Sequence, residues 1–150
     1  MFLDVQALPA TTPFDELAPD GYRAMVGLDG ALWLDPRLRE LVEVRTAQLH
    51  RCAARLARHA REALDLGEKQ ERLTGLSSWR RSLVFTGRER AALGLAEAIV
   101  QADREAIATA RRVAADHFDE HELAQLAFAC VAANAWDRLE LAVGPLGEFG

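Results

Sequence analysis

Residues 35–67 read DPRLRELVEVRTAQLHRCAARLARHAREALDLG, and this stretch decides the fold. Asp35 followed by Pro36 is a strong signal for a helix start, because the carboxylate can accept from free backbone amides and proline needs no donor there. Apolar side chains recur at helical spacing as far as Leu66, and Gly67 is typical of the residue that follows a helix. Residues 38–66 contain no glycine or proline, so local rules predict one long helix there, or two if the chain breaks within it.

Helix signals also recur on both sides of this stretch, and no segment shows the alternation of a half-buried strand. Thr86 with Glu89 and Asp119 with Glu122 are spaced as capping boxes, and Asp103 is a further candidate cap. The expected helices besides 38–66 span about 19–34, 68–79, 86–101, 103–116 and 119–143. The prediction is an all-α single domain of six or seven helices over residues 19–150. Residues 1–18, with Pro9 and Pro13, are expected to form an extended arm with at most a short turn.

Composition excludes several classes of protein. The 150 residues fit one domain, and 50 % hydrophobic with 27 % charged residues is a soluble globular composition. A net charge of −5 argues against a nucleic-acid partner, and the longest apolar run is far short of the roughly 20 residues that cross a bilayer. The first basic residue is Arg23, so the positive region of a secretion signal is missing and a cytoplasmic location is expected. Cys52 and Cys130 are too few and too far apart for a disulfide framework.

The stretch around Cys52 carries the chemistry that the sequence offers. At 100° per residue, Cys52 and His59 fall on one helix face, two turns and about 10 Å apart, which is too far for a direct hydrogen bond. Arg55 lies between them, one turn before His59. Each residue also has an ordinary structural interpretation: Cys52 and His59 as core residues, Glu40 as a surface carboxylate, and Arg55 as a boundary side chain with its head in water.

Scattered segments of the chain, in this order and spacing, resemble the carboxymuconolactone decarboxylase superfamily and specifically its alkylhydroperoxidase (AhpD-like) branch. The resemblance covers about Tyr22 to Leu141. It is carried by 35–42 (DPRLRELV), Gln48, Cys52, His59, 67–68 (GE), 78–79 (SW), 85–86 (FT), 89–93 (ERAAL), 117–118 (HF) and 134–139 (NAWDRL). It implies an AhpD-like helical fold and a homo-oligomer.

The resemblance also implies a redox site. In that branch a glutamate precedes a Cys-x-x-Cys pair by twelve residues, and a histidine follows the second cysteine by four. Glu40, Cys52 and His59 match these positions, whereas Arg55 stands where the second cysteine would be. The two-thiol cycle cannot close with Arg55, so peroxide reduction would use Cys52 alone, with Glu40 and His59 as a proton relay and an external thiol as reductant.

The resemblance also implies where the helix that carries Cys52 would begin. Members of the family often have a small or turn-forming pair just before the first cysteine, which places that cysteine at a helix N-terminus. Here the pair is His50 and Arg51, and neither residue is a helix breaker.

Three functional hypotheses follow. The first is single-thiol reduction of a small hydroperoxide, which expects Cys52 to be accessible with a lowered pKa. The second is acid/base chemistry on a carboxylated small molecule, in which His59 exchanges protons, Glu40 orients it and Arg55 holds the carboxylate. At the position of the second thiol, Arg55 is expected either to pair with Glu40 or to bind such a ligand carboxylate. The third is a non-catalytic binding or structural subunit. No cofactor and no metal are expected, because the cluster His117, Asp119, Glu120 and His121 is interpreted as an acidic helix start.

Overall fold

The computed structural model describes residues 14–144 and residue 146, and over these residues the chain is helical without strands. The elements are α1 (Phe14–Leu17), α2 (Pro19–Ala31), α3 (Pro36–His50), α4 (Ala53–Asp65), α5 (Gln70–Gly75), the 3₁₀ helix η1 (Leu76–Arg81), α6 (Gly87–Gln101), α7 (Arg104–Ala114) and α8 (Glu120–Val143). The prediction of an all-α domain of about seven helices is confirmed. Residues 1–13 of the expected arm lie outside the described residues, and its last residues include the short turn α1.

The predicted helix starts have the expected capping contacts. The Asp35 carboxylate accepts from the backbone N–H of Leu38 at 2.9 Å, and Asp103 accepts from Ala106 at 2.7 Å. Both capping boxes are complete, Thr86 with Glu89 at α6 and Asp119 with Glu122 at α8. Each cap satisfies an amide that the helix itself leaves free, which fixes where these helices begin.

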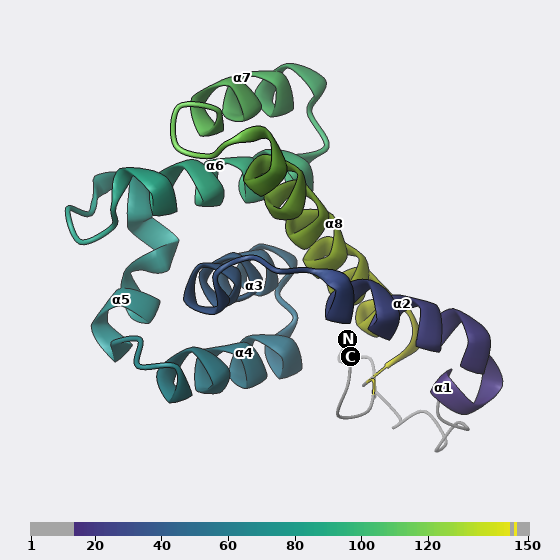
Figure 1. The fold of residues 1–150 in the computed structure, drawn as a ribbon. Helices are drawn as coiled ribbons and strands as arrows, with labels where there is room; N and C mark the ends of the chain where they lie inside the picture. Colours follow the sequence, from purple (N-terminus) through teal and green to yellow (C-terminus); the bar gives the residue numbers. More distant parts are fainter. Residues whose placement is uncertain (1–13, 145, 147–150) are drawn as a thin grey trace, which may run out of the picture.

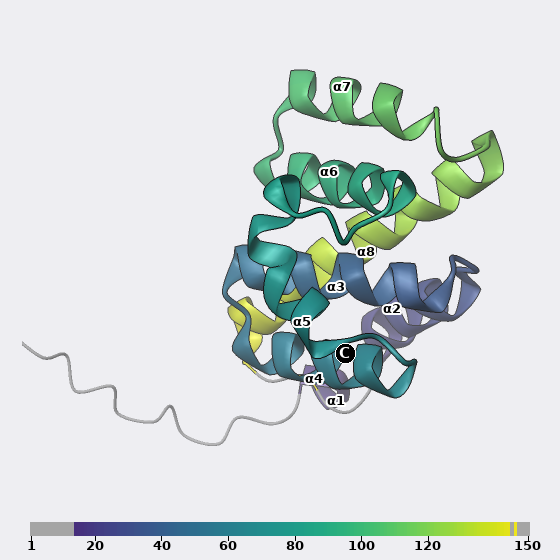
Figure 2. The ribbon, with the colours of Figure 1, turned by 90° about the vertical axis from the view of Figure 1, so that its left-hand side faces the viewer.

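Helix α3 lies at the centre of the domain. Figures 1 and 2 both show α7, α6, α3 and α4 in succession, with α8 crossing α6 and α3. Helix α2 runs along the far part of α8, where the rings of Tyr22 and Trp136 meet edge to face at 5.8 Å between centroids. One apolar cluster fills the space between α3, α6 and α8, and a second lies between α3, α4, η1 and α6. Within the described residues no helix is long and apolar enough to cross a membrane.

The expectation of one long helix over 38–66 is wrong, because the chain breaks at Arg51. Arg51 adopts a left-handed conformation with φ 56° and ψ 37°, and the N–H of Cys52 closes the end of α3 by donating to the Ala47 carbonyl at 3.0 Å. Such a conformation is unfavourable for a residue with a Cβ. It is maintained because α4 folds back on α3, burying Ala63 against Leu41 and Val44 in the second cluster. Local propensity carries no information about that packing.

The helix expected over 68–79 also differs from the observed structure. It begins at Gln70 and divides into α5 and η1, with non-helical backbone at Ser78. Packing in the second cluster supplies the reason, since it buries Leu73, Leu76 and Trp79 together. Their spacing of three residues suits the tighter 3₁₀ turn.

Candidate functional site

The turn at Arg51 makes α3 and α4 an antiparallel pair of helices, and this places two acidic residues of α3 opposite two basic residues of α4. Glu43 faces Arg55 close to the turn, and Glu40 faces His59 further from it. Glu40 and Glu43 are three residues apart on α3, and Arg55 and His59 are four apart on α4, so the two residues of each helix lie on the same face, which faces the other helix. The structure therefore brings Glu40, Arg55 and His59 into one buried polar cluster.

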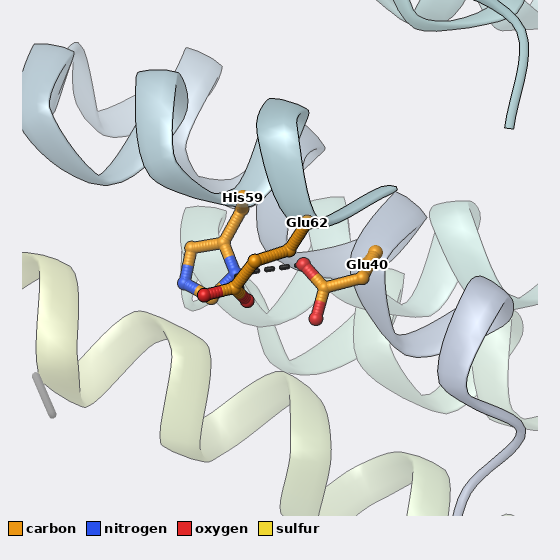
Figure 3. A group of neighbouring side chains, drawn as sticks. All are labelled: Glu40, His59 and Glu62. Carbon is orange, nitrogen blue, oxygen red and sulfur yellow. Dashed lines mark hydrogen bonds and ion pairs between the residues drawn. The ribbon is translucent and has the colours of Figure 1, made fainter. Parts of the chain in front are cut away.

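Three carboxylates surround the imidazole of His59, which is 5 % exposed. Its Nδ1 lies 2.7 Å from Glu40 Oε2, at hydrogen-bonding distance, and 3.4 Å from Glu62 Oε2. Figure 3 shows Glu40 and Glu62 close to the ring, with a dashed line marking the contact of Glu40 with Nδ1. On the other side, Nε2 lies 3.5 Å from Glu43 Oε2 and has no hydrogen-bond partner within the described residues. The pairing of buried Glu40 with His59 excludes the interpretation of Glu40 as a fully solvated surface residue.

Burial shifts the pKa values of Glu40 and His59 in opposite directions. It raises the pKa of Glu40 to about 7, because desolvation of the carboxylate outweighs the nearby arginines. It lowers the pKa of His59, although Glu43 and Glu62 oppose the change. The hydrogen bond between them joins two groups that can exchange a proton, as general acid/base chemistry requires.

Arg55 is 1 % exposed, so the expectation of a boundary arginine with its head in water is wrong. Its Nε donates to Asp137 at 2.6 Å and its Nη2 donates to Glu43 at 2.8 Å. The alternative expectation of a pair with Glu40 is also wrong, because α8 and the near turn of α3 supply closer carboxylates. Burial disfavours the charge, but Glu43 and Asp137 raise the pKa of Arg55 above its ordinary value. Its Nη1 is buried without a partner among the described residues.

Cys52 precedes the first residue of α4 and is 3 % exposed. Burial raises the pKa of its thiol, and the negative charges of Glu140 and Asp137 add to the increase. The backbone amide and the guanidinium of Arg55 act in the opposite direction without prevailing. The accessible thiol with a lowered pKa that the first hypothesis expected is therefore not found, because the surrounding helices cover the sulfur.

Sequence reasoning missed two residues of the cluster, Glu43 and Asp137. A weak signal existed for each. Glu43 follows Glu40 by three residues and so shares its helix face, and Asp137 is an acidic residue directly after the mostly apolar stretch 126–136. Both are buried, and burial raises the pKa of Asp137 to about 6 against the opposing effect of Arg55.

The other residues singled out in the sequence lie apart from this cluster. Cys130 is buried in the first apolar cluster, as expected. Asp119 caps α8, in agreement with the interpretation of residues 117–121 as a helix start. A cavity of about 530 Å³ lies between α6 and α7, lined on one side by Trp79 and Glu97.

A family model, a curated relative and a solved structure each match most or more than half of this chain. The sequence model of the carboxymuconolactone decarboxylase family matches residues 19–98. The chain is 28 % identical over 134 residues to YdfG, an uncharacterized protein of Bacillus subtilis strain 168, and the match covers 86 % of this chain and 90 % of that one. The fold is similar to the crystal structure of an Agrobacterium tumefaciens protein of unknown function, a candidate antioxidant defence protein AhpD. That match has a TM-score of 0.81 and 26 % identity over 87 % of this chain and 92 % of the other.

Proposed function

Because this chain belongs to the carboxymuconolactone decarboxylase family, we propose that it is an AhpD-like thiol oxidoreductase that reduces small hydroperoxides through Cys52 alone. The observation that carries the proposal is the break at Arg51, which places Cys52 at the N-terminus of α4 although neither His50 nor Arg51 is a helix breaker. The partial positive charge of a helix N-terminus favours a thiolate over a thiol, and here it opposes the burial that raises the pKa of the Cys52 thiol. In one continuous helix over 38–66, Cys52 would lie in the middle of the helix, away from this partial charge.

The chemistry begins with attack of the Cys52 thiolate on one oxygen of the hydroperoxide. The S–O bond forms, the O–O bond breaks, and the leaving alkoxide takes up a proton, so that a sulfenic acid and an alcohol result. One external thiol then condenses with the sulfenic acid, releasing water and giving a mixed disulfide. A second external thiol releases Cys52 and leaves with the first as a disulfide. Arg55 occupies the position of a second motif cysteine, so α4 supplies no thiol to resolve the sulfenic acid, and Cys130 is buried in the core.

Proton transfer is assigned to Glu40 and His59, acting through the polar cluster. His59 is two helical turns from Cys52, too far to contact the sulfur directly. Glu43 approaches both His59 and Arg55, and Arg55 in turn holds Asp137, whose charge acts on Cys52. This series couples the charge of the Glu40–His59 pair to the thiol, because Arg55 keeps its own protons and transfers none.

The test is mass-spectrometric trapping of sulfenic acid after one equivalent of an organic hydroperoxide. The expected result is modification of Cys52 and not of Cys130, with the rate at least about tenfold lower in His59→Asn. His117→Asn, which changes a histidine outside the cluster, is the matched control and should behave as wild type. A folded protein that yields no sulfenic acid on Cys52 would refute the proposal.

A second candidate is acid/base chemistry on a carboxylated small molecule. It is favoured by the lowered pKa of His59, which keeps the imidazole neutral and able to accept a proton, and by the unpartnered Nη1 of Arg55. Arg55 would hold a carboxylate by this one nitrogen only, since its other donors are engaged. Turnover that survives Cys52→Ser and is lost in His59→Asn would select this chemistry. Absence of both activities would assign the chain to a non-catalytic role.

We also propose that the chain forms a homo-oligomer. Helix α2 contributes no buried residue to the single chain, and Trp33, Phe128 and Val131 are large apolar side chains left exposed. A second copy that covers these surfaces would remove apolar area from water. Light scattering coupled to size exclusion should give a mass that is a multiple of 16.5 kDa, and a mass of one chain would contradict the proposal.

A further inference from the structure

The imidazole of His59 has carboxylates on both sides and too few protons to satisfy them. Glu40 and Glu62 face Nδ1 at 2.7 and 3.4 Å, and Glu43 faces Nε2 at 3.5 Å. A neutral imidazole carries one N–H, so it can donate to only one side. The cluster therefore contains acceptors for a further positive charge.

The geometry on the Nδ1 side suits a metal ion. Nδ1 of His59 and one carboxylate oxygen each of Glu40 and Glu62 lie within 4.8 Å of one another. Zinc ligands of this kind lie about 2.0–2.2 Å from the ion, so two of them are at most about 4.4 Å apart. Small movements of the three side chains would therefore bring their ligand atoms to coordinating distance. Glu40 comes from α3, and His59 and Glu62 lie one turn apart on α4, so all three converge from two packed helices (Figure 3). The side chain of Glu62 is 47 % exposed, which provides an entry path and a ligand free to adjust.

On the Nε2 side, the carboxylate of Glu43 lies near enough to support a metal-bound histidine after a small movement. Histidine ligands characteristically donate their other N–H to a carboxylate, which fixes the ring and strengthens the ligand. With a metal on Nδ1, the single proton of His59 resides on Nε2, where Glu43 lies 3.5 Å away and is itself held by Arg55 at 2.8 Å. Metal binding on Nδ1 would thus direct the ring proton toward Glu43, at an Nε2 atom that has no hydrogen-bond partner within the described residues.

We infer that Glu40, Nδ1 of His59 and Glu62 form a binding site for a divalent first-row transition-metal ion of the zinc class, with water in the remaining positions. The site does not depend on the proposed function, because binding is measured without peroxide. Bound metal would occupy both members of the Glu40–His59 pair and thereby stop proton exchange between them. The site is thus also suited to metal-dependent inhibition of any reaction that uses this pair.

The test uses the full-length chain, reduced and metal-free, in calorimetric titration with Zn²⁺ and in optical titration with Co²⁺. We expect one ion per chain, and visible Co²⁺ absorption that Zn²⁺ abolishes and Mg²⁺ does not. Glu62→Gln changes a partly exposed side chain and should weaken Zn²⁺ binding at least about tenfold. Glu105→Gln on α7, also exposed, is the matched control and should bind as wild type.

Arg58→Ala is a second variant that changes affinity in the opposite direction. Arg58 Nε lies 3.5 Å from Glu62 Oε1, so its guanidinium competes with the metal for that carboxylate. Its removal should tighten Zn²⁺ binding. No saturable binding at one ion per chain, or equal affinity of wild type and Glu62→Gln, would overturn the inference. Spectra with sulfur-to-cobalt charge transfer would do the same, because they would place the ion on a cysteine.

Discussion

Removal of the Arg55 side chain should strongly destabilise the fold, because Arg55 compensates two buried carboxylates. Its ion pairs with Asp137 and Glu43, at 2.6 and 2.8 Å, have side chains no more than 3 % exposed. Loss of one partner of a buried ion pair typically lowers the free energy of unfolding by about 3–5 kcal/mol. For a chain of this length, Arg55→Ala should therefore lower the melting temperature by about 10 °C at pH 8.

The pH dependence separates this mechanism from simple loss of packing. Without Arg55, the pKa values of Glu43 and Asp137 should rise further, so that these groups become protonated in the folded state as the pH falls. Each carboxyl protonated in this way recovers up to about 1.4 kcal/mol per pH unit. The destabilisation by Arg55→Ala should consequently be much smaller at pH 5.5 than at pH 8.

The assay is urea unfolding followed by circular dichroism at both pH values. Arg61→Ala, an exposed arginine on the same helix, is the control and should change stability little at either pH. The triple variant Arg55→Met, Glu43→Gln, Asp137→Asn should recover most of the stability, because neither carboxylate is then left charged without its partner. A loss below about 1 kcal/mol for Arg55→Ala at pH 8, or an equal loss at both pH values, would refute the reasoning.

Three further predictions concern the turn, the relay and the thiol. Arg51→Gly should raise the free energy of unfolding by about 0.5–1 kcal/mol, because glycine adopts the left-handed conformation without strain; an unchanged or lower value in urea unfolding would contradict this. Glu40 binds more protons in the folded than in the unfolded chain, since its pKa rises from 4.5 to about 7, so its contribution to stability declines as the pH rises between these values. Between pH 4.5 and 7, the free energy of unfolding of wild type should therefore fall by about 2–3 kcal/mol relative to that of Glu40→Gln. Equal changes in the two proteins would contradict the raised pKa of Glu40. Alkylation of Cys52 by iodoacetamide should accelerate up to pH 9 without a plateau, because burial raises the pKa of the thiol above 9.0; a plateau near neutral pH would show a lowered pKa instead.

The helix starts could be predicted from the sequence because capping is local. Asp35, Thr86, Asp103 and Asp119 each bond to an amide three residues ahead, so a short window of sequence contains both partners. The break at Arg51 could not be predicted in this way. It depends on burial of the α4 face against α3, which outweighs the preference of an arginine for ordinary helical backbone.

The candidate site was predicted only in part for the same reason. The positions of Glu40, Cys52 and His59 followed from a family resemblance, and the structure brings Glu40 and His59 into contact. The partners of Arg55 depend on long-range packing, since Asp137 is 82 residues away along the chain. The proposed metal ligands gave no sequence signal either, because Glu40 precedes His59 by 19 residues, outside any short ligand motif.

The most direct test of the central claim, that Cys52 is the reacting group, is steady-state reduction of an organic hydroperoxide with excess external dithiol. Wild type and Cys130→Ser should consume the peroxide at equal rates that rise with pH, and Cys52→Ser should show no activity above the uncatalysed reaction. Activity retained in Cys52→Ser, or absent from folded wild-type protein, would contradict the account.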